Sequence, residues 1–189
     1  MISAILLAAG QSKRMEGENK LIKKIQGIPL IKLSVQNILA SSINELIIVL
    51  GHQKEIIEKF IDKNEKIKFV FNKDFESGIA SSIKAGLNHL SNNTEAFFIC
   101  LGDMPLVNKN IYNDLIKSKN NNKIIVPTYK GEQGNPILFS KTMKAKIMTV
   151  QGDSGAKMIL QLNEDKVFNF ETNNENVVKN FNTIESFNS

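Results

Sequence analysis

The 189-residue chain carries a formal net charge of +5 and has a pI near 9.2, with 42% hydrophobic and 23% charged residues. Its lysines are spread out, without a basic block or interleaved aromatic residues, which argues against a nucleic-acid groove and favours a small anionic ligand. Cys100 is the only cysteine, which excludes an internal disulfide and a cysteine metal cluster and indicates a reducing compartment.

No apolar run approaches the ~20 residues that a membrane span requires. Met1 leads almost directly into the first apolar run, which leaves no room for the charged leader and apolar core of a signal peptide. We therefore expect a cytoplasmic protein that has neither a membrane nor a nucleic acid as its partner.

Continuous apolar runs alternate with stretches of helical period along most of the chain. The alternation predicts one α/β domain over residues 1–189, with a mostly parallel, doubly wound, Rossmann-like sheet and helices on both faces. The predicted strands are 2–7, 45–50, 67–71, 96–101, 124–126, 136–139 and 167–170. The predicted helices are 29–40, 53–61, 78–90, 108–117, one from about 141 and one from 155 to 162, with a hairpin or loop at 131–134.

The first predicted strand ends at Gly10, and a loop of small polar residues with two cations, Arg14 and Lys20, follows. Glycine lets the backbone turn with its amides exposed, so that these amides and the two cations can face phosphates. Arg14 is the only arginine beside 23 lysines, and its planar guanidinium matches a phosphate in a way that an ammonium cannot. The loop lacks the further glycines of a dinucleotide fingerprint and the Gly-Lys-Ser/Thr of a P-loop. It predicts a nucleotide triphosphate site, with an ordinary surface turn as the alternative.

Polar residues also follow other predicted strands. Asp103 comes just after strand 96–101, where open α/β sheets bind ligands, and its carboxylate suits Mg²⁺; a turn aspartate is the alternative. Asn72 ends strand 67–71. Gly78 then opens a helix with Ser81 and Ser82, whose amides and hydroxyls suit a base edge or an anion unless the serines only support the helix start.

Two further elements lie in the second half of the chain. They are Gly134-Asn135-Pro136, followed by an apolar run, and Gly152-Asp153-Ser154-Gly155-Ala156-Lys157. Turn and helix-capping chemistry is the alternative interpretation of both.

These segments together resemble the MobA-like nucleotidyltransferases, which have a glycosyltransferase-A-like fold, and within them the cytidylyltransferases of molybdopterin. The resemblance covers nearly the whole chain and is strongest over residues 4–21, 99–105 and 134–157. It implies transfer of CMP from CTP to the terminal phosphate of molybdopterin (the molybdenum cofactor), with Mg²⁺ as cofactor, pyrophosphate as by-product and a client molybdenum hydroxylase as a further partner. The residues that it implies are Arg14, Lys20 and Asp103 for catalysis; Leu7, Ala8, Ala9, Gly10, Gln11, Ser12, Asn72, Gly78 and Ser82 for the nucleotide; Gly134, Asn135, Pro136, Asp153 and Lys157 for the acceptor; and Asp103 with Asn182 for the metal.

The chemistry of such a transfer fits the residues present. A phosphate is largely ionised near neutral pH, so its attack on the α-phosphorus needs in-line positioning and charge cancellation rather than a catalytic base. Two alternatives stay open. GTP can replace CTP, although Ala9, where the guanylyl branch commonly has glycine, favours cytosine. A non-catalytic molybdopterin carrier is the other, because Glu16, Lys157 and Asn182 depart from the family's pattern.

Overall fold

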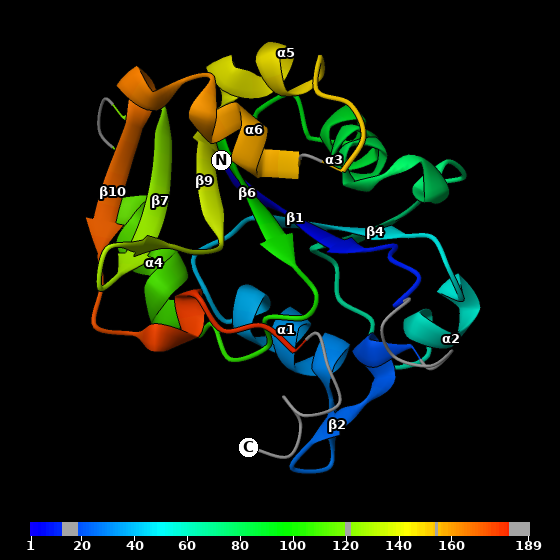
Figure 1. Ribbon diagram of the computed structural model, residues 1–189. Helices are drawn as coiled ribbons and strands as arrows, with labels where there is room; N and C mark the ends of the chain where they lie inside the picture. The colour runs from blue at the N-terminus through cyan, green and yellow to red at the C-terminus, as the bar shows by residue number, and fades with distance from the viewer. Residues whose placement is uncertain (13–18, 120–121, 154, 182–189) are drawn as a thin grey trace.

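A central sheet with helices on both faces organises the chain (Figure 1). The computed structural model describes residues 1–12, 19–119, 122–153 and 155–181, without the side chains of 156 and 157. The strands are β1 (Ile2–Ala8), β4 (Glu45–Leu50), β5 (Ile67–Phe71), β6 (Ala96–Leu101), β7 (Ile124–Tyr129), β8 (Glu132–Gln133), β9 (Ile137–Ser140) and β10 (Val167–Glu171), with a separate hairpin of β2 (Lys24–Ile25) and β3 (Ile28–Pro29). The α-helices are α1 (Leu30–Leu39), α2 (Lys54–Glu58), α3 (Ile79–Asn88), α4 (Lys109–Lys117), α5 (Lys144–Ile147) and α6 (Gly155–Gln161). Short 3₁₀ turns are η1 (Lys20–Ile22), η2 (Phe75–Ser77), η3 (Lys141–Met143), η4 (Glu164–Lys166) and η5 (Glu175–Val177).

The strand order is β10-β7-β9-β6-β1-β4-β5, with β8 paired to β7. Strand β9 is antiparallel to both of its neighbours and β8 is antiparallel to β7, while the remaining six strands all run in one direction. The mostly parallel sheet confirms the predicted fold class. Because parallel strands end at a common edge, the segments that follow β1, β4, β5 and β6 meet at one side of the molecule.

The central strands are buried on both faces. Alternate residues of β1 enter two separate cores, Leu6 joining the core beneath α1, α2 and α4 and Ile5 the core beneath α3, α5 and α6. A strand covered by helices on both sides needs apolar residues at every position. This is why the continuous runs in the sequence predicted β4 and β6 with their observed bounds. The edge strand β5 was also predicted with its observed bounds, although most of its residues are exposed.

Several elements differ from the prediction. Strand β7 continues past Pro127 to Tyr129, because Pro127 is held in place by its neighbours: it pairs with Phe170 of β10, and its carbonyl accepts from Gly134 N at 2.8 Å. Helix α2 is shorter than predicted and begins after Gln53, which has a left-handed φ of 54°. The β2–β3 hairpin was not predicted, since two-residue strands carry no periodic signal.

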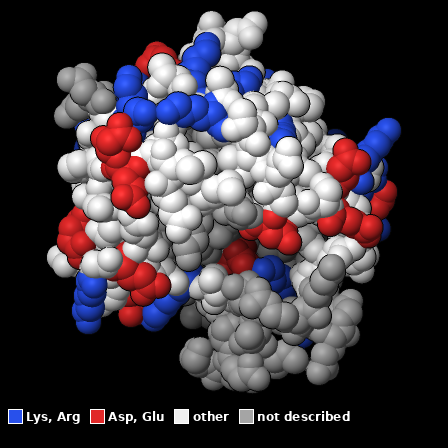
Figure 2. Space-filling model, turned by 45° about the horizontal axis from the view of Figure 1, so that its top comes forward, with Lys and Arg blue, Asp and Glu red and all other residues white. Residues whose placement is uncertain are grey.

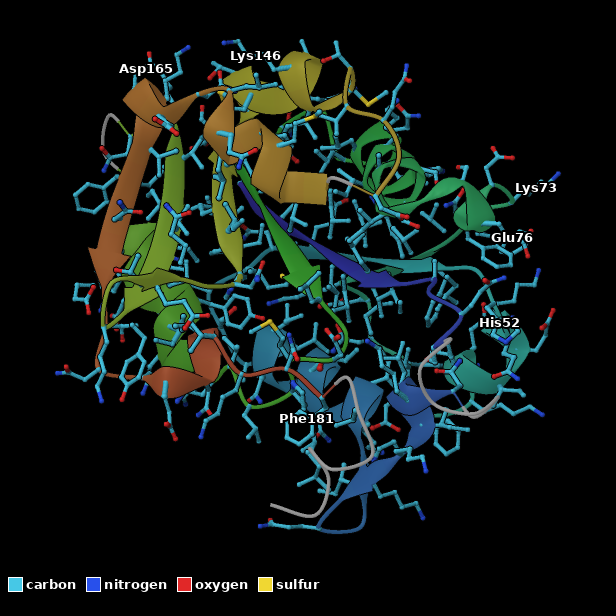
Figure 3. All side chains as sticks on the ribbon, in the orientation of Figure 1. His52, Lys73, Glu76, Lys146, Asp165 and Phe181 are labelled. Atoms are coloured by element: carbon cyan, nitrogen blue, oxygen red, sulfur yellow. The ribbon has the colours of Figure 1, made fainter. Side chains whose placement is uncertain are left out.

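Uncharged residues make up most of the face shown in Figure 2, and lysines gather in the upper part of this view. Around α5, the neighbouring Lys166 ammonium lowers the pKa of Lys146, whose Nζ donates to Asn163 Oδ1 at 2.8 Å. Lys146 and Asp165 lie at the end of the sheet away from His52 and Phe181 (Figure 3). Within the described residues, no helix combines the length and the apolar character needed to cross a membrane.

Candidate active site

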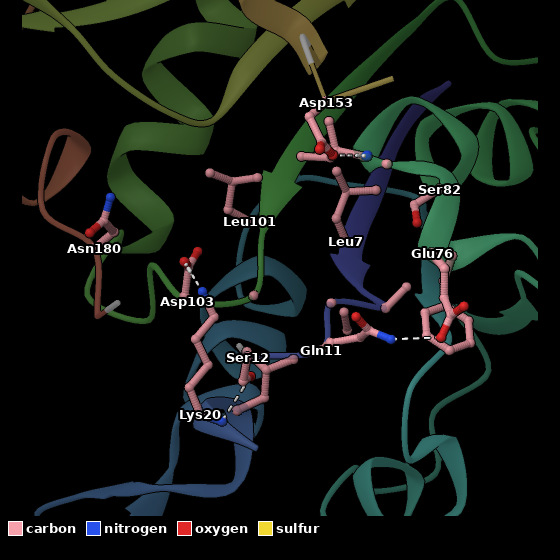
Figure 4. A pocket seen from close by; sticks show the side chains of 18 residues that line it. Leu7, Gln11, Ser12, Lys20, Glu76, Ser82, Leu101, Asp103, Asp153 and Asn180 are labelled. Carbon is pink, nitrogen blue, oxygen red and sulfur yellow. Dashed lines mark hydrogen bonds and ion pairs between the residues drawn. The ribbon is translucent and has the colours of Figure 1, made fainter. Parts of the chain in front are cut away.

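A cavity of about 550 Å³ lies where β1 and β6 end, opposite the start of α3 (Figure 4). Three walls enclose it: the loop after β1, the loop after β6 and the η2–α3 segment. The residues that line it are Leu7, Ala8, Ala9, Gly10, Gln11, Ser12, Lys20, Leu21, Phe75, Glu76, Gly78, Ile79, Ser82, Leu101, Gly102, Asp103, Asp153 and Asn180.

The first wall is the loop that leaves β1. Ser12 has a left-handed φ of 52°, and its Oγ accepts a hydrogen bond from the Lys20 amide at 3.1 Å, so the two described ends of the loop lie together. Asn19 caps the 3₁₀ turn η1, because its Oδ1 accepts from Leu21 N at 3.0 Å. The loop therefore delivers Lys20 to the cavity beside the residues that follow β1. Arg14 lies outside the described residues.

The second wall is the loop that leaves β6 and carries Asp103. It is fixed to β1 by the Gly102 amide, which donates to the Leu7 carbonyl at 3.1 Å. Helix α1 also holds the loop after β6. Ser34 Oγ donates to the Gly102 carbonyl at 3.1 Å, and Asn37 Nδ2 donates to the Pro105 carbonyl at 2.8 Å. These bonds hold the backbone on both sides of Asp103 at the strand edge.

Lys20 and Asp103 meet across these two walls. Lys20 Nζ lies 2.6 Å from Asp103 Oδ2, and the side chains are only 19% and 12% exposed. A charge-assisted hydrogen bond of this kind is stronger in a partly buried site than on the surface. The pair brings a cation and a carboxylate, both predicted as catalytic, to one end of the cavity.

The third wall comes from η2 and α3. Asn72, itself buried, donates from Nδ2 to Ser82 Oγ at 3.0 Å and to Ser81 Oγ at 2.8 Å, so it supports the serine that faces the cavity without lining the cavity itself. Gly78 has a φ of 107° and packs against the Gly152 backbone, where a Cβ would come within 2.6 Å of the carbonyl. Asp153 Oδ1 accepts from the Ile79 amide at 3.2 Å and so satisfies the first amide of α3.

The two ends of the cavity differ in charge. Lys20 lies at the Asp103 end, whereas the α3 end carries Glu76 and Asp153 with no cation among its described lining residues. Gln11 Nε2 donates to Glu76 Oε1 at 2.7 Å and joins the first wall to the third (Figure 4). Phosphates therefore fit the Lys20 end, and a ligand with hydrogen-bond donors fits the α3 end.

The structure brings most of the predicted nucleotide and catalytic residues into this one cavity. Gly134, Asn135 and Pro136 do not line it: the Asn135 amide donates to the Val177 carbonyl at 2.8 Å. Their acceptor role stays a prediction. Asn182 lies outside the described residues, as does the side chain of Lys157.

Seven lining residues were not among the predicted site residues: Leu21, Ile79, Leu101 and Gly102, which lie close to predicted positions in the sequence, and Phe75, Glu76 and Asn180. Phe75 and Glu76 belong to a 3₁₀ turn without a sequence pattern of its own, and Asn180 arrives from the far end of the chain. The segment of residues 72–78 between a predicted strand end and a predicted helix start was the one signal for Phe75 and Glu76.

The donor set at the Lys20 end fits a divalent cation such as Mg²⁺. Within the described residues, Lys20 is the one hydrogen-bond partner of the Asp103 carboxylate, and Asn180 adds an amide to the cavity. No three His, Cys, Asp or Glu side chains gather into a metal-binding group in the described part of the chain. Mg²⁺ usually takes only one or two protein carboxylates, with phosphates and water completing its shell. Asp103 suits that mode of binding.

Comparison with known proteins places the fold and the family. The model of the MobA-like NTP transferase domain matches residues 4–167. The molybdenum cofactor cytidylyltransferase of Escherichia coli is 27% identical over 187 residues, which cover 98% of this chain and 93% of that protein. A probable molybdenum cofactor guanylyltransferase of Methanosarcina acetivorans is 31% identical over 137 residues, 69% of this chain, and the match spans only 59% of that relative's length.

A solved structure agrees with this fold. The protein Rv0371c of Mycobacterium tuberculosis, in complex with manganese, superposes with a TM-score of 0.84 at 18% identity, covering 99% of this chain and 96% of that one. At such low identity the superposition shows the fold alone.

Proposed function

Because the chain belongs to the MobA-like NTP transferase family, we propose that it transfers CMP from CTP to the terminal phosphate of molybdopterin and releases pyrophosphate. The observation that carries the proposal is the meeting of Lys20 and Asp103 with residues 10–12 in one cavity. The end-to-end match to a cytidylyltransferase supports the same reaction.

The reaction needs no catalytic base. An oxygen of the acceptor phosphate, ionised because its second pKa is about 6, attacks the α-phosphorus of CTP. The bond from that phosphorus to the oxygen bridging the α- and β-phosphates breaks, and pyrophosphate leaves with the electron pair. The protein contributes in-line positioning and stabilisation of negative charge.

The described residues supply these contributions from two sides. Lys20 lies in the cavity, held toward it by Asp103, and its ammonium stabilises charge that develops at the α-phosphate. Backbone amides after Gly10, together with Arg14, hold the β- and γ-phosphates. Asp103, with Asn182, would hold Mg²⁺, which would supply further charge neutralisation to the triphosphate.

The α3 end of the cavity receives the base. The Glu76 side chain offers oxygen atoms that accept hydrogen bonds, and Ser82 faces the cavity from α3. The 4-amino group of cytosine is a donor that suits Glu76, whereas uracil offers a carbonyl oxygen at that position. GTP is the second candidate, because guanine also presents donors to a carboxylate and a guanylyltransferase is among the relatives. Ala9 narrows the cavity by one methyl group relative to glycine and favours the smaller base.

A nucleotide panel tests the proposal. Purified protein is incubated with Mg²⁺, molybdopterin and CTP, GTP, UTP or ATP in turn, and pyrophosphate release is measured. We expect release with CTP above that with GTP, and none without acceptor. A protein that binds nucleotide and acceptor but releases no pyrophosphate would be a carrier rather than an enzyme.

Asp103→Asn tests the residue assignment. The substitution keeps the shape but removes the charge, and we expect kcat/KM to fall by about 10²–10³, the usual loss for one electrostatic group in an active site. Asp114→Asn is the matched control, since Asp114 also pairs with a lysine, Lys117 at 3.3 Å, but on the exposed surface of α4. Equal activity in the two variants would remove Asp103 from the machinery.

A further inference from the structure

The turn that contains Gly134 packs against the C-terminal part of the chain. We call residues 174–181 the C-terminal strap. The Gly134 amide donates to the Pro127 carbonyl of β7 at 2.8 Å, and the next amide, that of Asn135, donates to the Val177 carbonyl of the strap at 2.8 Å. The turn thus joins the sheet to the strap through two consecutive amides.

The contact between the turn and the strap is tightest at Gly134, where no space is left for a side chain. A Cβ there would lie 2.2 Å from the Val177 carbonyl oxygen and 2.6 Å from its carbonyl carbon. Both are backbone atoms, and Val177 is fully buried. A side chain at position 134 must therefore push the strap away from the sheet by about an ångström or more.

The far end of the strap touches the active site. The Phe181 amide donates to the Asp103 carbonyl at 2.9 Å, and Asn180 lines the cavity. Figure 4 shows Asn180 on the Asp103 side of the cavity, opposite Glu76, and Figure 3 shows Phe181 near α1. Only three residues lie between the buried anchor Val177 and Phe181, which bonds to Asp103, so a shift at the anchor reaches the Asp103 loop.

We propose that Gly134 is a positioning residue, whose lack of a side chain seats the C-terminal strap so that Asn180 and the Asp103 loop form the wall of the cavity that faces the incoming acceptor. This inference rests on the proposed nucleotidyl transfer. The backbone of Val177, the strap's anchor, is hydrogen-bonded to Asn135 and Asn174, and neither residue belongs to the nucleotide wall made by the β1 loop, η2 and α3. The acceptor must then approach from the remaining side, where Asp103 and Asn180 lie.

The proposal predicts different effects on the binding of the acceptor and the binding of CTP, whereas a general loss of stability would affect both. Gly134→Ala displaces the Asp103–Asn180 wall and leaves the nucleotide wall in place. We expect kcat/KM for the acceptor to fall about 10²-fold, the cost of a misplacement of about 1 Å. The Kd of CTP measured without Mg²⁺ should change by less than about twofold, because in the proposed site the base and the β- and γ-phosphates are held by the β1 loop, η2 and α3 and not by Asp103.

Gly131→Ala is the matched control. Gly131 lies in the same hairpin with a φ of 81°, so alanine strains its turn, but a Cβ there meets no atom within 4 Å. This variant should keep the acceptor kinetics of the wild type. If Gly134→Ala does not fold, Val177→Ala serves instead, because it loosens the same contact by shortening the side chain on the strap. It should lower kcat/KM for the acceptor by a smaller factor and again leave the Kd of CTP unchanged.

Hydrogen exchange tests the position of the C-terminal strap without an activity assay. In Gly134→Ala, and not in Gly131→Ala, peptides covering residues 99–106 and 174–181 should exchange about tenfold faster, while those covering β1 and α3 keep their rates. Unchanged exchange in those two peptides, or equal acceptor kinetics in the two variants, overturns the proposal. If the wild type transfers no nucleotide, the proposed function fails, and the exchange experiment still decides whether Gly134 seats the strap.

Discussion

Glu45 is expected to make the stability of the protein depend on pH. It lies at the amino end of β4, away from the cavity, with 3% of its surface exposed. Its Oε2 accepts from Ser3 Oγ at 2.8 Å and from the Ser91 amide at 3.2 Å, and its Oε1 accepts from Lys68 Nζ at 2.5 Å. Burial by itself raises the pKa of Glu45, but these hydrogen bonds outweigh burial and hold the pKa below its ordinary value.

The cost of Glu45→Gln follows from these contacts. Glutamine can keep one carbonyl oxygen toward Ser3 and Ser91, but both bonds lose the charge that strengthens them, at about 1 kcal/mol each. Lys68 loses its partner, but its side chain is 55% exposed, so screening by water limits that loss to about 0.5 kcal/mol. The free energy of unfolding at pH 7 should therefore fall by about 2.5 kcal/mol, and Tm by roughly 5–10 °C.

The sign of the pH dependence is fixed by the lowered pKa. A carboxylate with a depressed folded-state pKa stabilises the fold above its unfolded value, about 4.3, and this contribution is lost as the pH falls through the folded value. Urea unfolding of the wild type and Glu45→Gln should show a gap that is full at pH 7 and smaller at pH 4. Glu55→Gln, an exposed control on α2, should stay within about 0.5 kcal/mol of the wild type. A gap of constant size across this range would refute the reasoning.

Two further predictions concern packing. Gly86→Ala in α3 should destabilise the protein by about 1–2 kcal/mol, because a Cβ would lie 2.3 Å from Ile5 Cγ2 and overpacking outweighs the better helix propensity of alanine; a higher Tm would contradict this. Cys100 is 1% exposed, and burial raises its pKa to about 12. Native protein at pH 8 should therefore resist iodoacetamide for hours, as followed by mass spectrometry, and become alkylated in urea.

The parts of the fold that could be predicted are those in which the residue types depend directly on the local structure and burial. The runs at β4 and β6 are apolar at nearly every position because helices cover both faces, and Asn108 caps α4 through bonds to Asn110 N and Ile111 N, as a residue of its type does at a helix start. The continuation of β7 through Pro127 depends on its sheet neighbours, and the sequence around it indicates a break.

The site divides in the same way. The strand ends predicted the β1 loop and Asp103, since every parallel strand must end at the shared edge. Glu76 and Asn180 could not be predicted, because they reach the cavity through tertiary packing of a short turn and of the C-terminal strap. Asp153 was predicted as a site residue, but its bond to the Ile79 amide of α3 was not, because that bond depends on a contact between Gly78 and Gly152 that no local pattern indicates.

Glu45 and Asp103 show how one kind of pair serves two purposes. Each is a mostly buried carboxylate bonded to a lysine. At Glu45 both oxygens are occupied, by Ser3, Ser91 and Lys68, so the group has nothing left to offer a ligand and acts on stability. At Asp103 the described protein occupies one oxygen, through Lys20, and the carboxylate faces the cavity. Burying a carboxylate with bonding capacity left over costs stability, and it is useful only where a ligand completes the set. That difference, rather than burial or charge alone, distinguishes Asp103, for which we propose a role in the reaction, from the structural carboxylate of Glu45.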